Sequence, residues 1–115
     1  MRPNETWHVV CLRHDLVAYS GVVARVQQDQ VALFYVPASD GQSETVYAID
    51  NHDPRSGANV IGRGLVGQIA GQVVVAAPLY KQHYRLCDGV CLEDAGQRLR
   101  TWPARLNGEH VEISR

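Results

Sequence analysis

Three side chains that can ligate a soft metal ion recur at steps of four residues in the C-terminal half of the chain. They are His83, Cys87 and Cys91. On a helix these positions would share one face, and imidazole and thiolate groups gathered in this way suit zinc. Whether they form a metal site therefore depends on whether this segment is helical.

The dipeptide Asp88-Gly89 lies between the two cysteines and is typical of a two-residue β-hairpin turn rather than of a helix. Such a turn would pair Cys87 with Val90 and Leu86 with Cys91. Because neighbouring side chains of a strand point to opposite faces, the two sulfur atoms would then lie on opposite sides of the ribbon. We therefore expect the cysteines to be packing residues of strands, without a metal ion.

The other groups that could act in catalysis do not form a recognisable pattern. His14-Asp15 and His52-Asp53 are adjacent pairs, but adjacent side chains point in different directions in regular structure. No nucleophile turn accompanies them, so they are interpreted as surface histidines. Residues 62–67 have the letters of a dinucleotide-binding loop, but no helical pattern follows them. Neither acid–base catalysis nor nucleotide binding is predicted.

Length and composition indicate one globular domain over residues 1–115. Of the 115 residues, 45% are hydrophobic and 20% are charged, which is close to the average of folded domains. With 11 basic and 12 acidic side chains the net charge is −1. The chain therefore lacks the broad basic face that a nucleic-acid-binding module needs, and nucleic acid is not an expected partner.

Several features of the sequence favour a cytoplasmic protein. No apolar run approaches the roughly 20 residues that span a bilayer, and residues 1–5 are followed by polar residues instead of the apolar segment of a signal peptide. The 3 cysteines, which include Cys11, are an odd number, and this disfavours a disulfide framework. We expect reduced thiols, no contact with a membrane and a location in the cytoplasm.

The elements that would position these groups are predicted to be β-strands. Residues 22–26 and 31–36 are rich in β-branched and aromatic side chains and are separated by a polar stretch, which predicts an antiparallel pair. The turn at Asp40-Gly41 precedes a strand over residues 45–49. No window has the spacing of an amphipathic helix, and residues 13–17 would form at most one turn. The predicted fold class is all-β.

The last hairpin is the element that the sequence predicts in most detail. With Asn107-Gly108 as the two central turn residues, one face collects the apolar side chains. The predicted pairs across this hairpin are Leu106 with Glu109, Ala104 with Val111 and Trp102 with Ile113. The opposite face carries the polar residues Thr101, Arg105, His110 and Glu112. A shift by one residue would bury those charges, so turn and pattern agree on this register.

Two loops interrupt the predicted strands and are the places where a site is expected. Residues 51–71 connect two strands through a stretch rich in glycine and proline that has no period of its own. Loops of this length within a compact domain are usually functional. A shorter loop over residues 77–81 contains Pro78 and lies between a strand that starts at Val73 and a second strand.

The order of strands and loops resembles the Rieske ferredoxin domain over about residues 7–113. In that family one loop contains Cys-Pro-His, a second contains Cys-Pro-x-His, and the two cysteines and two histidines bind a two-iron two-sulfur cluster. Here the loops contain Asp53-Pro54-Arg55 and Ala77-Pro78-Leu79-Tyr80. The resemblance implies a Rieske-like fold of stacked antiparallel sheets with a small, degenerate cluster-binding subdomain at about residues 50–85.

Both prolines are retained, but all four ligand positions differ from those of the family. These positions hold Asp53, Arg55, Ala77 and Tyr80. Neither alanine nor arginine can coordinate iron, so the resemblance implies a Rieske-like domain without its cluster. We expect no metal, no catalytic residue and no cofactor in this chain.

Four short motifs make the chain similar to one branch of this superfamily, the small subunits of assimilatory NAD(P)H-dependent nitrite reductase. They are Asn51-His52-Asp53-Pro54, Gly62-Arg63-Gly64-Leu65, Pro78-Leu79-Tyr80-Lys81-Gln82 and Asp88-Gly89-Val90-Cys91. In these enzymes the large subunit carries FAD, an iron-sulfur cluster and sirohaem and passes electrons from NAD(P)H to nitrite, yielding ammonium. The resemblance implies a non-catalytic small subunit that supports the assembly, stability or activity of the large subunit.

The former cluster tip is one possible docking surface for that partner. The residues expected on such a surface are Arg55, Arg63, Tyr80, Lys81 and Gln82. Arginine and tyrosine often anchor interfaces because they combine contact area with directional hydrogen bonds. Alternatively, Arg55 and Tyr80 fill the space of the cluster and hold the two loops together through packing or a cation–π contact. The sequence leaves both interpretations open.

Other functions remain as alternatives and rank below the subunit. A Rieske-type ferredoxin that carries electrons would need iron and labile sulfide. A small zinc or mononuclear iron protein would use His52, Asp53 and His83. A β-barrel module for single-stranded nucleic acid would need a basic face with aromatic residues. A different cluster-less Rieske-like interaction module would need only a different partner.

Overall fold

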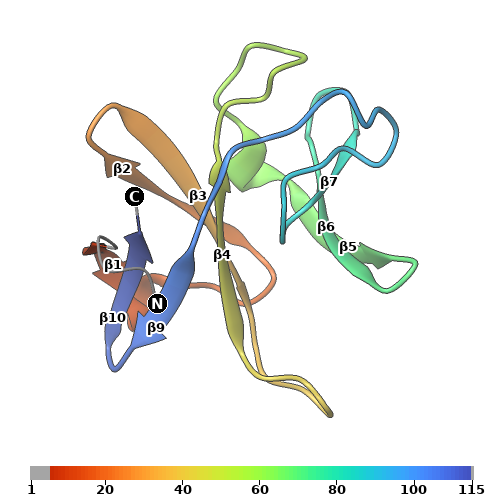
Figure 1. Ribbon diagram of the computed structural model, residues 1–115. Coiled ribbons are helices and arrows are strands. Elements are labelled where there is room, and N and C mark those ends of the chain that lie inside the picture. The colour runs from red at the N-terminus through yellow and green to blue at the C-terminus, as the bar shows by residue number, and fades with distance from the viewer. Residues whose placement is uncertain (1–5, 115) are drawn as a thin grey trace.

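The computed structural model describes residues 6–114 and consists of three antiparallel β-sheets (Figure 1). The first sheet has the order β1 (Trp7–Leu12), β10 (His110–Ser114), β9 (Ala104–Asn107). The second has the order β2 (Gly21–Val26), β3 (Asp29–Val36), β4 (Thr45–Asp50), β8 (Thr101–Trp102). The third has the order β5 (Leu65–Ile69), β6 (Gln72–Ala76), β7 (His83–Arg85). The prediction of an all-β fold with stacked antiparallel sheets is confirmed.

Only short helical turns accompany the strands in the described part of the chain. They are the 3-10 turns η1 (Arg13–Asp15) and η2 (Ile61–Arg63). The first lies within residues 13–17, for which the sequence predicts at most one turn. No helix among residues 6–114 is long and apolar enough to cross a membrane. Residues 1–5 and Arg115, which the sequence analysis includes in the single domain, lie outside the described residues.

The four-stranded sheet is the middle layer of the molecule, and its strand β3 is buried on both faces. Because side chains alternate along a strand, Val31 and Leu33 face one side of this sheet and Ala32 and Phe34 the other. The apolar cluster on the first side, here named the terminal core, contains Val31, Leu33, Val46, Ala48, Trp102, Val111 and Ile113. The cluster on the second side, here named the loop core, contains Ala32, Phe34, Ile49, Ile61, Val75, Ala77, Tyr84, Leu86, Cys91 and Leu99.

The predicted pairing of β2 with β3 is confirmed, and the strand predicted over residues 45–49 is found as β4, which pairs with β3. A two-residue turn at Gln27-Gln28 joins β2 to β3, with Gln27 in the left-handed region at φ 56°. Between β3 and β4, Asp40-Gly41 forms the predicted turn. The backbones of Ser39 and Gln42 exchange hydrogen bonds of 3.1 and 2.9 Å on either side of it. Local turn chemistry and strand propensity support the same structure in this part of the chain.

The last hairpin has the predicted faces but a different register. The observed pairs are His110 with Asn107, Val111 with Leu106, Glu112 with Arg105 and Ile113 with Ala104. The predicted pairs of Leu106 with Glu109, Ala104 with Val111 and Trp102 with Ile113 are therefore wrong. The central turn residues are Gly108, at φ 61°, and Glu109, which is the turn type that places glycine first. Trp102 pairs with Ala48 in β4 instead, because Pro103 separates it from β9.

The turn at Asp88-Gly89 is wider than predicted. The observed bridge joins Tyr84 to Cys91, whereas the predicted pairs, Leu86 with Cys91 and Cys87 with Val90, are not formed. The backbone N–H of Gly89 donates to the carbonyl oxygen of Arg85 at 2.7 Å, which closes a longer turn. Gly89, at φ 78°, also lies against Leu99: an added Cβ would be 2.0 Å from the Leu99 carbonyl oxygen. This close contact, which the sequence pattern does not reveal, sets the wider turn.

The glycine-rich segment 51–71 contains more regular structure than the sequence predicts. It includes η2 and the strand β5, which forms the outer edge of the third sheet. A Cβ at Gly64 would meet the carbonyl oxygen of Ala76 at 2.5 Å, so this glycine allows the chain to approach β6 closely. The sequence does not reveal the strand because Leu65 and Ile69 are exposed at the sheet edge, which removes the alternation of buried and exposed residues.

Candidate functional site

Two loops at one end of the molecule hold the residues that the family resemblance assigns to a cluster site. The first loop, residues 51–60, lies between β4 and η2, and the second loop, residues 77–82, lies between β6 and β7. In Figure 1 both loops lie at the top, remote from the hairpin of β9 and β10. The loop core lies beneath them, because Ile61, Ala77 and Tyr84 flank or belong to the loops and are buried in it.

The first loop is anchored by the buried side chain of Asn51. Its amide nitrogen donates to Oε1 of Gln30 at 3.0 Å and to the carbonyl oxygen of Asn59 at 3.2 Å. Its amide oxygen accepts a hydrogen bond from the backbone N–H of Gly62 at 2.7 Å. One side chain thus connects β3, the far end of the loop and η2, which explains why an amide with both donors and an acceptor is required there.

Asp53 forms the inner turn of the first loop and has no exposed surface. Its Oδ1 accepts the backbone N–H of Arg55 at 2.9 Å, and its own backbone N–H donates to the carbonyl oxygen of Ala58 at 2.8 Å. The carbonyl oxygen of Asp53 accepts the N–H of Gly57, which has φ 78°. These bonds hold a compact turn with a carboxyl group on its inner side.

The second loop closes through two backbone hydrogen bonds. The N–H of Ala77 donates to the carbonyl oxygen of Gln82 at 2.8 Å, and the N–H of Lys81 donates to the carbonyl oxygen of Ala77 at 3.0 Å. Lys81 adopts φ 62°, a conformation that costs a non-glycine residue energy. Ala77 is fully buried, whereas Leu79 and Tyr80 are each 56% exposed. The loop therefore presents its middle residues to solvent.

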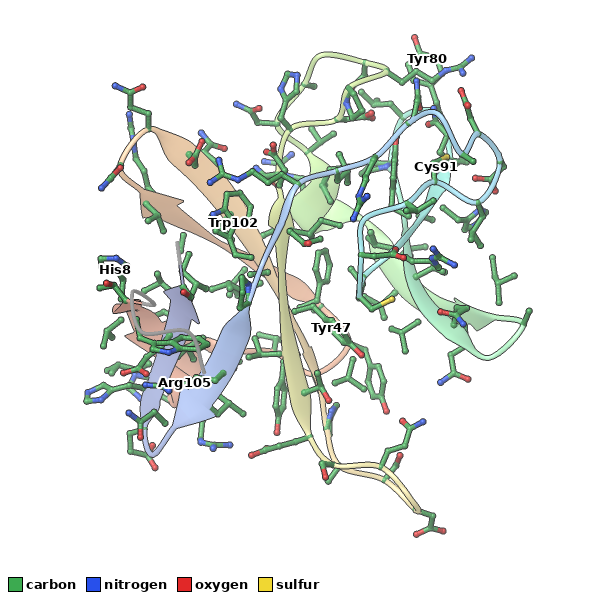
Figure 2. All side chains as sticks on the ribbon, viewed as in Figure 1. His8, Tyr47, Tyr80, Cys91, Trp102 and Arg105 are labelled. Carbon is green, nitrogen blue, oxygen red and sulfur yellow. The ribbon has the colours of Figure 1, made fainter. Side chains whose placement is uncertain are left out.

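A single cation–π contact connects the outer sides of the two loops. The guanidinium carbon of Arg55 lies 5.0 Å from the centre of the Tyr80 ring. Figure 2 shows Tyr80 at the tip of the molecule, beside the first loop. Both residues are exposed, so the contact belongs to the range of about 0.5–1 kcal/mol for solvent-accessible pairs. The loop-connecting contact that one interpretation of the sequence predicted is therefore present.

The electrostatics of the loop core are dominated by its buried tyrosine. Tyr84 has no exposed surface, and burial raises the pKa of its phenol to about 12, with the neighbouring charges of Asp53, Cys91 and Glu93 acting in the same direction. The Arg55 guanidinium acts in the opposite direction and lowers this pKa. The Tyr84 hydroxyl is 3.4 Å from Oε1 of Gln97, its hydrogen-bond acceptor. The phenol is neutral at physiological pH and lies within electrostatic reach of the Asp53 carboxyl group.

The side chains at the assigned ligand positions do not fit an iron-sulfur cluster. Ala77 has no side-chain atom that can ligate a metal, and Arg55 carries a fixed positive charge. Tyr80 is exposed, and its ring contacts the Arg55 guanidinium. Only the Asp53 carboxyl group is of a type that binds metals. Rieske clusters require two thiolates and two imidazoles, so this donor set cannot replace them.

The residues of the alternative metal site do not come together either. His52 Nδ1 lies 3.0 Å from Oδ1 of Asn59, whereas His83 Nδ1 lies 2.6 Å from Oε2 of Glu93. Burial opposes ionisation of Glu93, but hydrogen bonds from the His83 backbone and ring keep its pKa below the ordinary value. Within the described ranges no three His, Cys, Asp or Glu side chains gather closely enough to hold a metal ion.

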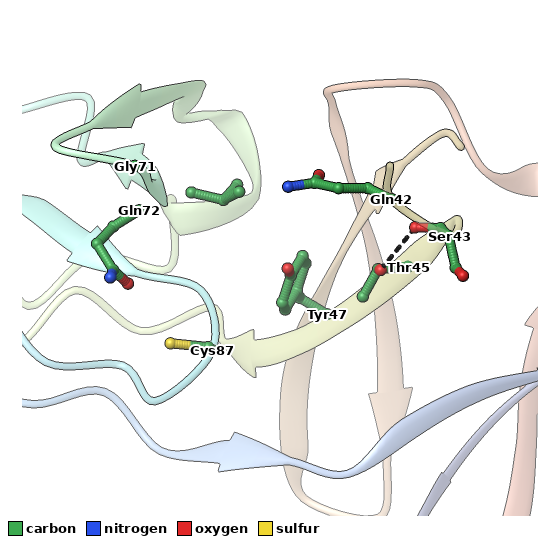
Figure 3. Close-up of a pocket in the computed structure, with 8 residues that line it drawn as sticks. Gln42, Ser43, Thr45, Tyr47, Gly71, Gln72 and Cys87 are labelled. Carbon is green, nitrogen blue, oxygen red and sulfur yellow. Dashed lines mark hydrogen bonds between the residues drawn. The ribbon is translucent and has the colours of Figure 1, made fainter. Parts of the chain in front are cut away.

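The cysteines lie apart. Cys91 is buried, Cys11 is half-buried, and Cys87 is exposed; all three are free thiols. Cys87 lines a pocket of about 340 Å³ between the second and third sheets, opposite Tyr47, whose pKa is raised by burial and by the nearby Cys87. Figure 3 shows the other lining residues, which come from β4, the loop before it, the turn at Gly71 and the start of β6. Their polar side chains are neutral amides and hydroxyls, and Val73 adds an apolar one. The sequence does not indicate this pocket, because three separate segments form it.

The five residues expected to bind a partner differ in their exposure to solvent. Arg55, Arg63, Tyr80 and Lys81 are exposed, but Gln82 is only 7% exposed and lies inside the second loop. Leu79, which is not one of these five residues, is exposed beside Tyr80. Its exposure as a large apolar residue at a loop tip is a signal that only the structure provides. The tip thus combines the side chains of Leu79 and Tyr80 with the cations Arg55 and Lys81, while Arg63 lies in η2.

Comparison with known families agrees with this geometry. Residues 6–114 match the family model described as Rieske-like [2Fe-2S] domain. The nitrite reductase (NADH) small subunit of Escherichia coli K12 is 36% identical over 107 residues, which cover 93% of this chain and 95% of that protein. The NMR structure of the Escherichia coli protein NirD has a TM-score of 0.84 and 34% identity, and the match covers 96% of this chain and 97% of the other.

A further relative is a much longer protein. The nitrite reductase [NAD(P)H] large subunit of Klebsiella oxytoca is 38% identical over 111 residues. The match covers 96% of this chain but only 11% of the length of that protein. A domain similar to this chain therefore occurs both as a short protein and as a segment of a long one.

Proposed function

Because the chain belongs to the Rieske-like [2Fe-2S] domain family and, within it, to the small subunits of nitrite reductase, we propose that it is the small, non-catalytic subunit of an assimilatory NAD(P)H-dependent nitrite reductase. The enzyme as a whole reduces nitrite to ammonium. The observation that carries this proposal is the similar segment within the Klebsiella oxytoca large subunit. A domain that is covalently part of a large subunit in one protein is suited to bind a separate large subunit in another.

In this proposal the large subunit performs the redox chemistry. It carries FAD, an iron-sulfur cluster and sirohaem, and electrons pass within it from NAD(P)H to nitrite. The small chain contributes no cofactor, since Ala77 and Arg55 stand where a Rieske cluster needs a thiolate and an imidazole. The same substitutions argue against an electron-carrying ferredoxin. What remains for the small subunit is to support the assembly, stability or activity of the large subunit.

The proposed docking surface is the tip formed by the two loops. It contains the cations Arg55 and Lys81, and Arg63 follows in η2 after the first loop. None of these three cations forms an ion pair with a carboxylate among residues 6–114. Exposed Leu79 and Tyr80 lie among these charges. Charged rims around apolar anchors suit a partner surface with an apolar recess and carboxylates around it. Buried Gln82 would support this surface from inside.

We place the complex in the cytoplasm. The support is chemical: Cys11, Cys87 and Cys91 are all free thiols, and Cys87 is exposed. Free, accessible cysteines are typical of reducing compartments, where glutathione and thioredoxin keep thiols reduced. NAD(P)H, the proposed electron source of the partner, is also a cytoplasmic cofactor.

The proposal is tested by purifying the large subunit with and without this chain and measuring nitrite-dependent oxidation of NAD(P)H. We expect the activity or the thermal stability of the large subunit to rise when the small chain is added at a stoichiometric ratio. Equal activity and equal stability in both preparations would contradict the proposal. Adding the Gly67→Ala variant should have the same effect as the natural chain, because a Cβ at Gly67 meets no atom within 4 Å.

The docking surface is tested separately by measuring binding and melting of two arginine variants. Arg55→Ala removes a cation of the tip, and Arg25→Ala removes an exposed cation of β2, outside the tip. If the tip docks, Arg55→Ala weakens binding of the large subunit with little change in melting temperature, and Arg25→Ala changes neither. If Arg55 only fills the space between the loops, its loss lowers the melting temperature and leaves binding by the folded fraction unchanged.

A further inference from the structure

Buried polar atoms without a protein partner are concentrated between the two loops. Among residues 6–114, the buried side-chain nitrogen or oxygen atoms without a hydrogen bond are Oδ2 of Asp53, Oε1 and Nε2 of Gln82, and Nε1 of Trp102. Three of these four atoms belong to one residue of the first loop and one residue of the second. Asp53 has no exposed surface and Gln82 is 7% exposed. Leaving such groups unpaired is costly, so their position on facing loops calls for a common explanation.

The two side chains face the same interior. Gln82, Tyr84 and Leu86 are buried while His83 and Arg85 between them are half-exposed, which is the alternation of a strand with one inner face. Gln82 therefore points to the same side as Tyr84. The Asp53 carboxyl group is close enough to Tyr84 to influence its phenol, and Asp53 has no exposed surface. The contact of Arg55 with Tyr80, each two residues along the chain from one of these side chains, joins the two loops at this level.

The chemistry of the three atoms restricts what can pair with them. Oδ2 of Asp53 and Oε1 of Gln82 are acceptors, whereas Nε2 of Gln82 is a donor. A cation would serve the two acceptors and leave the amide donor unpaired. An anion would serve the donor but meet the carboxylate of Asp53. A small neutral molecule that both donates and accepts hydrogen bonds satisfies all three atoms.

We propose that the two loops enclose a site for ordered water, in which one or two buried water molecules bridge Asp53 Oδ2 to the side-chain amide of Gln82. Buried water molecules typically make two to four hydrogen bonds to polar groups that lack a protein partner. In this arrangement the loops are connected twice, through water on the inside and through the contact of Arg55 with Tyr80 on the outside. The site is independent of the proposed function, because it requires no partner subunit.

The direct test is NMR detection of magnetisation transfer from water to the side-chain amide protons of Gln82 in the full chain. A long-lived buried water gives nuclear and rotating-frame Overhauser effects of opposite sign. Gln68, an exposed glutamine of β5, is the matched control and should show only the signature of rapidly exchanging surface water. If the amide of Gln82 behaves like that of Gln68 or shows no transfer from water, the proposal is overturned.

A double-mutant cycle gives a second, independent measurement. Asp53→Leu and Gln82→Met each retain the approximate volume of the side chain and remove its polar atoms. Each single change should lower the equilibrium constant for folding about tenfold, because it leaves the other group and its water without a partner. The double variant should lose clearly less than the product of the two factors, since both ends of the bridge are then absent and only the lost hydrogen bond from the Arg55 N–H, common to Asp53→Leu, remains. Multiplicative losses would show that the two groups share no bridge and would overturn the proposal.

Discussion

The terminal core and the loop core are built on opposite faces of the same strand, yet they are completed in different ways. Beneath β1, β10 and β9 the terminal core is apolar, and the buried carboxylate at its border, Glu112, is paired with Arg105 at 2.7 Å. Beneath the two loops, the loop core is accompanied by the buried polar side chains of Asn51, Asp53 and Gln82. The terminal core depends mainly on packing, whereas the region beneath the loops also depends on hydrogen bonds from several buried side chains.

This difference shows in which part of the molecule the alternation of apolar and polar residues along the sequence predicts the structure. The terminal core requires apolar side chains of suitable volume on one face of each strand, and a sequence with apolar residues at alternate positions provides them. In the loop core, irregular backbone must be held by specific side chains, such as Asn51 with its three hydrogen bonds. Substitutions that disturb packing should therefore destabilise the protein strongly in both cores. Substitutions that remove polar or surface contacts should affect stability differently in the two regions.

The largest effect on stability is expected from Gly89→Ala, because Gly89 lies against Leu99 of the loop core. The new Cβ would lie 2.0 Å from the carbonyl oxygen of Leu99, and φ 78° is unfavourable for alanine. We expect a loss of about 4 kcal/mol in the free energy of unfolding, measured by chemical denaturation. Gly67→Ala is the control and should change stability by less than about 0.5 kcal/mol. Unchanged stability of Gly89→Ala would show that the turn can move away from Leu99 at little cost, which would contradict this prediction.

A matched pair of truncations compares the packing of the two cores. Leu33 and Leu86 are both fully buried, but Leu33 lies on the central strand β3 and Leu86 lies in the turn after β7. We expect Leu33→Ala to cost about 3 kcal/mol and Leu86→Ala about 2 kcal/mol, because a turn can relax into the cavity more easily than a central strand. Denaturation of both variants measures the two costs. Equal losses would mean that the cores are equally rigid.

The loop core should also respond to alkaline pH. The pKa of Tyr84 is raised from 10.0 to about 12 in the folded chain, so above pH 10 the unfolded chain loses its phenolic proton first. The corresponding stability is fully present below pH 10 and is lost as the pH rises to about 12, on the order of 2 kcal/mol. The difference in stability between the natural chain and Tyr84→Phe, measured from pH 8 to 12, isolates this effect. A difference independent of pH would contradict it.

The smallest effects should come from two of the cation–π contacts, one in each region. Arg105 lies 4.1 Å from the Trp7 ring and also pairs with Glu112, so Arg105→Ala should cost about 1.5 kcal/mol. Arg55, at 5.0 Å from Tyr80, lacks such an ion pair among the described residues, and Arg55→Ala should cost about 0.5 kcal/mol. Thermal melting of both variants ranks the contacts, and the reverse order would contradict this comparison.

The contrast between the cores also explains how much of the fold could be predicted from the sequence. Strands β2, β3 and β4 follow from β-branched residues between turn dipeptides, and the faces of the last hairpin follow from alternation. The register of that hairpin was wrong by a two-residue step, since such a step keeps every side chain on its face. Alternation cannot detect this error, and only the position of Gly108 in the turn decides it.

The candidate site could be predicted only in part. Short motifs located Asp53, Arg55, Ala77 and Tyr80, and the contact of Arg55 with Tyr80 was one of two interpretations. The burial of Gln82 was not predicted, because it depends on whether the alternation of buried and exposed residues in β7 extends back to residue 82. Strand β5 was missed since an exposed edge strand has no alternation to reveal it. What escaped prediction are features set by contacts between distant segments.

Strand β3 is buried on both of its faces, and this determines how cooperatively the protein unfolds. Its backbone pairs with β2 on one side and β4 on the other, and its side chains fill both cores. Neither core can lose its packing without exposing a face of this strand, so the two halves share one cooperative unit rather than two. The amide protons of β3 should therefore exchange with solvent only through global unfolding, while those of the loops exchange through local fluctuations.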